Sequence, residues 1–289
     1  MVTSHESGPS DMSSKVVLIT GTSSGIGLAT AIAAARAGWQ TVATLRDTER
    51  AGALRQAAAD AGVELDIRKL DVTDELSVAT AIENLVSDYG RLDAVVNNAG
   101  IGHLGTLEND SMASVREVME VNYFGTLQVS KDALPHLRAS KGRLITVTSV
   151  GAIIGQPFNE AYCAAKFAVE GYMESLAPVA AELGVTVSVV EPGAVATEFV
   201  NNVGVDLDDE VAKAGPYADV LRVWLKVLFG LLDEAQSPAE VADTVLTALT
   251  SERPPFRLLT SDWGQKTASI KLSDVDGSAV QALASGWLK

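Results

Sequence analysis

A tyrosine and a lysine stand four positions apart in the segment Tyr162-Cys163-Ala164-Ala165-Lys166, and Ser149 precedes this segment. If the segment is helical, as its alanines indicate, the two side chains share one face with Cβ atoms about 5–6 Å apart. A free phenol titrates near ~10 and exchanges protons poorly at neutral pH. A neighbouring ammonium favours the phenolate and lowers that pKa. With a serine hydroxyl from a neighbouring strand end, the pair predicts a site that holds a substrate oxygen and moves a proton.

The composition fits an enzyme of this kind better than a protein that binds polyanions. The chain has 289 residues, 47% of them apolar, and a formal net charge of −15. The excess of acidic residues argues against nucleic acid and anionic membrane as partners. Cys163 is the sole cysteine, so the chain has no intrachain disulfide and no thiolate cluster. The histidines His5, His103 and His136 are scattered without ligand spacing, and we expect no metal.

No segment of the sequence predicts membrane insertion or export. Residues 1–14 are polar and lack the apolar core of a signal peptide, so they are interpreted as a disordered tail. The apolar stretch 220–232 is interrupted by Arg222 and Lys226 and is too short to span a bilayer. We therefore expect a soluble, cytoplasmic chain.

The elements that must position the site alternate between β-branched runs and alanine-rich segments of helical period. Strands are predicted at 15–20, 41–45, 65–70, 92–97, 143–149, 185–191 and 257–260. Helices are predicted at 25–37, 49–61, 74–89, 110–137 and 160–183. Thr73 is placed to cap the third of these, and Ser237-Pro238-Ala239-Glu240 predicts a further helix start with a capping box.

This alternation predicts an α/β fold, a single doubly wound Rossmann-type domain whose parallel sheet of about seven strands is covered by helices on both faces. We expect residues 15–260 to form this dinucleotide-binding and catalytic domain. A substrate lid is expected near 196–236 within it. Residues 261–289 are expected to be a C-terminal extension.

A glycine motif follows the first predicted strand, in Gly21-Thr22-Ser23-Ser24-Gly25-Ile26-Gly27. Glycines let the backbone turn tightly and approach a diphosphate, while the following helix presents its free amides to that charge. The motif therefore predicts dinucleotide binding.

These motifs, in their order, resemble the single-domain form of the short-chain dehydrogenase/reductase family. The resemblance covers residues 15–197 and continues past the glycine motif through Asp71-Val72, Asn97-Asn98-Ala99-Gly100, Asn122, Ser149, the Tyr162/Lys166 pair and Pro192-Gly193. It implies hydride transfer between a nicotinamide and a carbonyl or hydroxyl carbon.

The resemblance also implies which residues hold the cofactor. The glycine-motif residues Gly21, Ser23, Ser24, Gly25, Ile26 and Gly27 would bind the diphosphate, Asp71 and Val72 would contact the adenine, and Asn98, Ala99 and Gly100 would line the adenosine side. Pro192, Gly193 and Val195 would hold the nicotinamide amide, and Thr197 would reach the diphosphate.

The catalytic roles follow in the same way. Tyr162 would exchange the proton, while Lys166 would lower the phenol pKa and hold the nicotinamide ribose. Ser149 would hydrogen-bond the substrate oxygen, and Asn122 would hold a water that connects Lys166 to solvent. Cys163 points away from this helix face and is interpreted as a buried filler. His103 is either a surface or structural histidine or a residue at the substrate mouth.

The end of the second predicted strand indicates cofactor choice. Preference for the unphosphorylated nucleotide normally requires a carboxylate there, bonded to the ribose hydroxyls. The sequence has Leu45 at that position, followed by Arg46, whose guanidinium can clamp a 2′-phosphate. We therefore expect NADP(H) to be preferred over NAD(H), although Asp47 is adjacent and Ser24 stands where some relatives carry a second basic residue.

The substrate is expected to be a hydrophobic alcohol or ketone. Apolar residues fill the segments in which relatives build their pocket: Ile153, Ile154, Phe158, Phe199 and Val200. The segment 220–232 is either a lid over the substrate or a helix packed on the body or on a partner subunit. A weaker similarity, carried by 44–47 and 254–257, is to the steroid and retinol dehydrogenase branch.

Two other functions compete with this one. A non-enzymatic dinucleotide-binding redox sensor would usually lack the tyrosine or the lysine. An epimerase or dehydratase would carry a differently spaced glycine motif and a larger C-terminal domain. We expect a homodimer or homotetramer, paired through the helices at 110–137 and 160–183.

Overall fold

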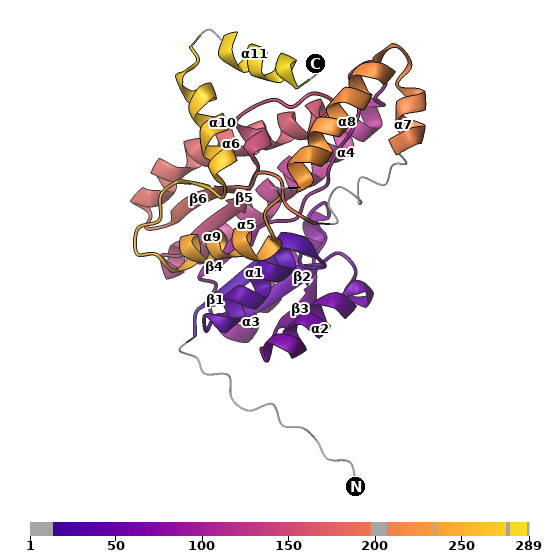
Figure 1. Ribbon diagram of the computed structural model, residues 1–289. Helices are drawn as coiled ribbons and strands as arrows, with labels where there is room; N and C mark the ends of the chain where they lie inside the picture. The colour runs from indigo at the N-terminus through magenta and orange to yellow at the C-terminus, as the bar shows by residue number, and fades with distance from the viewer. Residues whose placement is uncertain (1–13, 198–206, 234, 276–277, 288) are drawn as a thin grey trace.

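The computed structural model describes residues 14–197, 207–233, 235–275, 278–287 and 289. Within this part of the chain, seven strands form one parallel sheet in the order β3-β2-β1-β4-β5-β6-β7 (Figure 1). The strands are β1 (Val16–Thr20), β2 (Gln40–Leu45), β3 (Asp66–Lys69), β4 (Ala94–Asn97), β5 (Arg143–Val147), β6 (Thr186–Glu191) and β7 (Arg257–Leu259). The doubly wound α/β fold expected from the sequence is confirmed.

Helices cover both faces of this sheet, and further helices extend beyond one end of it. The helices are α1 (Gly25–Arg36), α2 (Gly52–Ala61), α3 (Glu75–Tyr89), α4 (Met112–Met119), α5 (Gly125–Ser140), α6 (Glu160–Glu182), α7 (Leu207–Lys213), α8 (Ala218–Asp233), α9 (Pro238–Thr250), α10 (Asp262–Ser273) and α11 (Ser278–Gly286). Across the described residues, none of these helices has the length and apolarity that a bilayer crossing requires.

The strands are apolar on both sides because each face of the sheet carries its own layer of helices. Along β1, Val16 and Leu18 pack into the cluster formed with α3, α5 and α6. Val17 and Ile19 point the other way, into the cluster formed with α1, α2 and α9. This alternation fixes the register of the central strand, because a slip of one residue would exchange the two faces.

The helix expected over 110–137 is interrupted. It consists of α4, a π-helical turn at Glu120–Phe124, and α5. The turn contains the fully buried Asn122, whose amide is paired with the backbone of Ile101. A π-helical turn inserts an extra residue into the helix and is frequent at functional sites. The sequence analysis expected one uninterrupted helix here, because a single π-helical turn keeps the chain helical on both sides.

The helix caps agree with the sequence at one site and differ at another. Ser237 and Glu240 form the expected capping box at the start of α9. The expectation that Thr73 caps α3 is wrong. Asp74 is the cap, with its carboxylate accepting hydrogen bonds from the amides of Leu76 and Ser77 at 3.0 and 3.1 Å. Thr73 instead donates its hydroxyl proton to Asp71.

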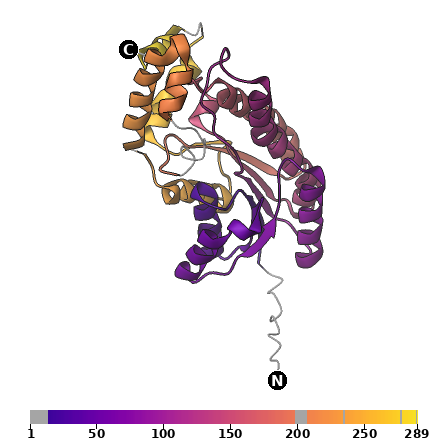
Figure 2. The same cartoon turned by 90° about the vertical axis from the view of Figure 1, so that its right-hand side faces the viewer.

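The C-terminal part of the chain is built onto the end of the sheet at which the strands finish. Figure 2 shows α8 and the C-terminal helices, in orange and yellow, grouped together apart from the helices that flank the sheet. Trp287, which follows α11, packs against Trp224 of α8. Residues 1–13 of the tail expected over 1–14, together with Phe199 and Val200, lie outside the described residues.

Candidate active site

A cavity of about 890 Å³ lies at the carboxyl ends of the strands and extends from the turn after β1 to α8. Of the catalytic and cofactor-binding residues named from the sequence, all except Asn122 line this cavity. Ligands of open α/β sheets bind in the crevice at this edge. The structure therefore brings the separate motifs together in one continuous space.

Tyr162 and Lys166 project from α6 into this cavity while remaining 8% and 6% exposed. The Lys166 Nζ lies 5.7 Å from the centre of the Tyr162 ring and donates a hydrogen bond to the Val147 carbonyl at 3.1 Å. Ser149, just after β5, hydrogen-bonds the Tyr162 hydroxyl and also accepts a hydrogen bond from the Gly151 amide at 3.0 Å. Gly151 packs closely here, because a Cβ would lie 3.3 Å from both Ser149 Oγ and the Tyr162 ring.

The electrostatics of the pair differ from the sequence-based expectation. Burial raises the pKa of Tyr162 to about 12, although the Ser149 hydroxyl opposes that rise. Burial also lowers the pKa of Lys166 to about 8. The ammonium is directed at the Val147 carbonyl and lies beside the ring, so desolvation of the phenol dominates. The lowering of the phenol pKa that we expected from Lys166 is not produced by the chain's own groups.

Asn122 supports the site from outside the cavity wall. Its Oδ1 accepts a hydrogen bond from the Ile101 amide and its Nδ2 donates to the Ile101 carbonyl, both at 2.9 Å. Gly100 lies between Asn122 and Lys166, and a Cβ there would come 2.8 Å from Asn122 Oδ1 and 3.7 Å from Lys166 Nζ. Asn122 therefore holds the turn after β4 against the lysine.

The glycine turn is tightly built around Asn98. The Asn98 Nδ2 donates to the carbonyls of Thr20 and Gly21 at 2.9 and 3.0 Å. Gly21 has φ +71°, and a Cβ on Gly27 would lie 2.2 Å from the Gly21 carbonyl. Ser24 is the N-cap of α1 without a side-chain bond to the first turn, so its hydroxyl and the helix amides are available to an anion in the cavity.

Basic residues gather at the β2 end of the cavity. Leu45 stands at the position expected for a ribose-binding carboxylate and is 3% exposed. Its apolar side chain offers no hydrogen bond to a ribose. Arg46 follows it on the cavity wall, and so does Arg50, which the sequence analysis did not name. The neighbouring Asp47 is occupied as a cap, accepting a hydrogen bond from the Glu49 amide at 3.0 Å.

The remaining cofactor candidates line the rest of this half. Asp71 accepts hydrogen bonds from the amide and hydroxyl of Thr73, at 3.0 and 2.8 Å, and Val72 lies against Gly125. Thr197 packs next to Gly25, where a Cβ would lie 3.1 Å from Thr197 Cγ2.

The other half of the cavity is apolar. Its wall is formed by residues of α8 together with two tryptophans of the C-terminal segment: Trp224, Leu225, Leu228, Phe229, Leu231, Leu232, Trp263 and Trp287. The two C-terminal tryptophans had not been named from the sequence, because no pattern connects them to a site about 100 positions earlier in the chain. Ile153, Ile154 and Phe158, which we expected on the wall, are buried behind it. Gln156 and Asn159 line the wall from the same segment.

His103 lines the cavity near this end and is not a surface residue. Its side chain is 5% exposed, and its Nε2 lies 3.2 Å from the Asp110 carboxylate. Gly105 permits this approach, because a Cβ there would lie 2.0 Å from Asp110 Oδ1. Cys163 is buried as expected, and burial raises the pKa of its thiol to about 11, which makes it a poor nucleophile.

Comparison with known proteins identifies this arrangement. Residues 15–208 match the family model described as short chain dehydrogenase. The chain belongs to the short-chain dehydrogenase family. It is therefore an oxidoreductase that acts on CH–OH groups and transfers hydride between a nicotinamide dinucleotide and an alcohol or ketone.

Two curated members of the family are similar over most of their length. Retinol dehydrogenase 8 of Bos taurus is 37% identical over 277 residues, which cover 91% of this chain and 87% of that protein. The 17-beta-hydroxysteroid dehydrogenase type 1 of Mus musculus is 40% identical over 283 residues, covering 94% and 80%. The crystal structure of a short-chain dehydrogenase from Streptomyces avermitilis has a TM-score of 0.75 at 30% identity and covers 96% of this chain and 97% of its own.

Proposed function

We propose that this short-chain dehydrogenase is an NADP(H)-dependent oxidoreductase whose substrate is a hydrophobic alcohol or ketone. The observation that carries the proposal is the continuity of one cavity. It has Arg46 and Arg50 at one end, Tyr162 in the middle and the aromatic wall of α8 at the other. A dinucleotide and an apolar substrate can thus meet at the tyrosine.

The residues of the first half fit a dinucleotide. Gly27 packs against the Gly21 carbonyl too closely for any Cβ, which keeps the turn tight, and Ser24 and the first residues of α1 line the cavity beside it. The proposed cofactor residues are Gly21, Ser23, Ser24, Gly25, Ile26, Gly27, Arg46, Asp71, Val72, Asn98, Ala99, Gly100, Tyr162, Lys166, Pro192, Gly193, Val195 and Thr197. When bound, the nicotinamide supplies the hydride acceptor or donor.

The preference for NADP(H) is supported by charge. A 2′-phosphate at the β2 end would meet the guanidinium groups of Arg46 and Arg50, and charge-assisted hydrogen bonds of this kind are the strong ones. Leu45 provides no carboxylate to bond the free ribose hydroxyls of NAD(H). Asp47 also lines this end of the cavity, with its Oδ1 accepting a hydrogen bond from the Glu49 amide.

The proton chemistry is assigned to Tyr162. With its pKa raised to about 12, the phenol is protonated at neutral pH and can donate to a substrate oxygen during ketone reduction. Ser149, already hydrogen-bonded to this hydroxyl, would hold the same oxygen. Lys166 would bind the nicotinamide ribose, and Asn122 would position Lys166 through Gly100 and a water.

The substrate class is supported by the aromatic wall. Large planar apolar side chains bury substantial area and suit ligands of similar character. The two curated relatives are named for retinol and for a hydroxysteroid, both of which are apolar alcohols. We infer that α8 acts as the substrate lid expected near 196–236.

We further propose that the enzyme is cytoplasmic and forms a homodimer or homotetramer. Aromatic side chains are exposed at the π-helical turn before α5 and along α6: Phe124, Phe167 and Tyr172 are 51%, 37% and 44% exposed. Light scattering of the purified chain measures the oligomeric state directly. A monomer at all concentrations would contradict the proposed homodimer or homotetramer.

The test of the function is cofactor consumption. Purified enzyme is mixed with NADPH and a panel of apolar ketones, and the absorbance of NADPH is followed. We expect oxidation that Tyr162→Phe abolishes while NADPH binding remains. Tight NADPH binding without turnover across the panel would favour the redox sensor instead.

A further inference from the structure

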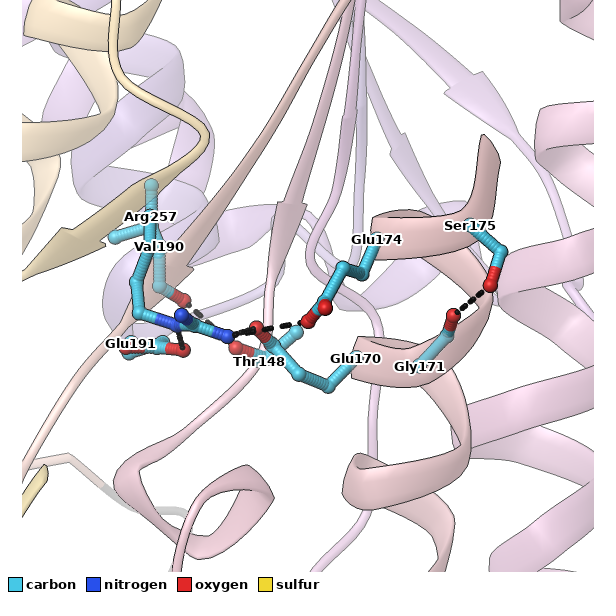
Figure 3. A network of polar contacts seen from close by, with 8 residues as sticks. All are labelled: Thr148, Glu170, Gly171, Glu174, Ser175, Val190, Glu191 and Arg257. Atoms are coloured by element: carbon cyan, nitrogen blue, oxygen red, sulfur yellow. Dashed lines mark hydrogen bonds and ion pairs between the residues drawn. The ribbon is translucent and has the colours of Figure 1, made fainter. Parts of the chain in front are cut away.

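A buried group of two carboxyls and one guanidinium ties α6 to β6 and β7 at one edge of the sheet (Figure 3). Arg257 of β7 donates from Nε to Glu191 Oε1 at 2.8 Å and from Nη2 to Glu170 Oε1 at 2.6 Å. Glu191 is fully buried and Glu170 is 6% exposed. A third carboxylate, Glu174, lies 3.6 Å from Nη2, but its side chain is 66% exposed. These four are the charged groups that meet here from α6, β6 and β7.

This group connects the parts of the chain that form the catalytic site. Glu170 follows Lys166 by four positions on α6, so the two side chains share a helix face. Glu191 is the last residue of β6 and immediately precedes the Pro192-Gly193 turn, which lines the cavity. The ion pair between Glu191 and Arg257 therefore lies directly beside that turn in the chain.

The charges of this group do not balance when both acids are ionised. Two buried carboxylates facing one guanidinium leave a net charge of −1, and burial of an uncompensated charge is costly. One proton would make the buried group neutral. Burial and the neighbouring Glu170 together raise the pKa of Glu191 to about 8.

The hydrogen bonding leaves a place for that proton. Glu170 Oε2 and Glu191 Oε2 are both buried without a hydrogen-bond partner among the described residues. The other oxygen of each carboxyl is held by adjacent nitrogens of the same guanidinium, so the two carboxyls lie side by side. A proton on one acid would satisfy both remaining oxygens at once, whereas a buried acceptor without a partner costs about 1–3 kcal/mol.

We propose that Glu170 and Glu191 share one proton and that, with Arg257, they position the Pro192-Gly193 turn against the face of α6 that carries Lys166. The second half of this statement rests on the proposed function, because it concerns the place of the nicotinamide. Glu170 and Glu191 are positioning residues and touch neither substrate nor cofactor.

Three variants separate this idea from a general structural role. Glu191→Gln keeps the shape, accepts from Arg257 and donates from its amide to Glu170, and so imitates the protonated acid. Glu191→Leu removes both interactions. Glu174→Gln is the matched control, because Glu174 contacts the same guanidinium from outside the buried pair.

Infrared spectroscopy detects the shared proton directly. At neutral pH we expect the carbonyl band of a protonated carboxyl in the wild type and in Glu174→Gln, and its loss in Glu191→Gln. If Glu191→Gln retains the band of the wild type, the shared proton is refuted.

The pH dependence of unfolding gives a second readout that needs no cofactor. An acid whose folded pKa is raised contributes stability that is fully present below its ordinary pKa of 4.5 and is lost as pH rises toward about 8. Relative to Glu191→Gln, the unfolding equilibrium constant of the wild type should therefore rise by up to about tenfold per pH unit across that window. Parallel profiles for the two proteins would overturn the proposal.

NADPH titration at neutral pH tests the positioning. We expect Glu191→Gln and Glu174→Gln to bind as the wild type does, and Glu191→Leu to bind about tenfold or more weakly, because small displacements of positioning groups have large effects. Equal weakening in Glu191→Gln and Glu191→Leu would refute the positioning role. If neither the wild type nor any variant binds NADPH, but the infrared and unfolding experiments give the expected results, the shared proton is supported and the proposed function is wrong.

Discussion

Trp224 of α8 and Trp287, near the end of the chain, lie with their ring centres 5.7 Å apart at a tilt of 42°. Both line the cavity above Tyr162. The C-terminal segment thus forms part of the apolar wall of the cavity, although the sequence suggested only an extension. The contact joins the candidate lid to the last residues of the chain.

This contact predicts a substrate-specific effect of shortening Trp287. In Trp287→Ala we expect KM for bulky apolar ketones to rise by about 3- to 10-fold, because an aromatic pair contributes about 0.5–1.5 kcal/mol beyond its buried area. The NADPH dissociation constant should stay unchanged, since Trp287 is remote from the glycine turn. Leu272→Ala, at an exposed position of α10, is the control. A loss of cofactor affinity in Trp287→Ala would contradict this assignment.

Cofactor selectivity should depend on the two arginines at the end of β2. In the double variant Arg46→Ala/Arg50→Ala we expect the NADPH dissociation constant to rise by about 100-fold or more, because hydrogen bonds to charged groups contribute about 1.5–3 kcal/mol each. NADH binding should change little. Arg55→Ala, exposed on α2 and away from the cavity wall, should match the wild type for both nucleotides. Equal losses for NADPH and NADH would show that the arginines do not recognise the phosphate.

The pH dependence of catalysis follows from the raised pKa of Tyr162. Ketone reduction uses the phenol, which is protonated below about 12, whereas alcohol oxidation uses the phenolate, whose fraction increases with pH. Below about pH 8, where Lys166 remains charged, we expect kcat/KM for oxidation to rise with pH by up to about tenfold per unit, while reduction does not rise. Steady-state kinetics in both directions measures this. An oxidation rate that does not change with pH would contradict the role of the phenol.

Asn122 should contribute to stability as well as to the site. In Asn122→Ala both 2.9 Å hydrogen bonds to Ile101 are lost, and the part-buried amide and carbonyl of Ile101 remain without these partners. We expect the free energy of unfolding to fall by about 2–4 kcal/mol, measured by urea denaturation. Asn109→Ala, at an exposed position of the preceding loop, should change it by less than about 0.5 kcal/mol. Similar values for the two variants would show that the pairing with Ile101 is energetically unimportant.

The sequence predicted the sheet, and it predicted that the glycine motif, Tyr162 and Lys166 would lie together, because both depend on local patterns. Glycines between a strand and a helix make a tight turn, and the i to i+4 spacing puts Tyr162 and Lys166 on one helix face. Neither result depends on how the rest of the chain packs. Arg50 could not be predicted in this way. It lies in a short 3₁₀ turn, which has no periodic sequence pattern, and this turn brings it to the cavity with Arg46.

The substrate half depends on tertiary packing and could not be predicted in the same way. Ile153 and Ile154 are apolar in the expected segment, yet they pack behind the wall, while Gln156 of that segment lines it. Trp287 reaches the site only because α10 and α11 fold back over the sheet end. The electrostatics of Tyr162 also required the structure, since burial outweighs the charge of a lysine whose ammonium is directed elsewhere.

The most direct test of the central claim follows the hydride itself. The enzyme is given NADPH carrying deuterium at the transferable position of the nicotinamide, together with an apolar ketone, and the product alcohol is examined by mass spectrometry. We predict one deuterium on the carbinol carbon of the product, and no product from Tyr162→Phe. An alcohol without deuterium, or equal product from the Tyr162→Phe enzyme, would contradict hydride transfer at this site.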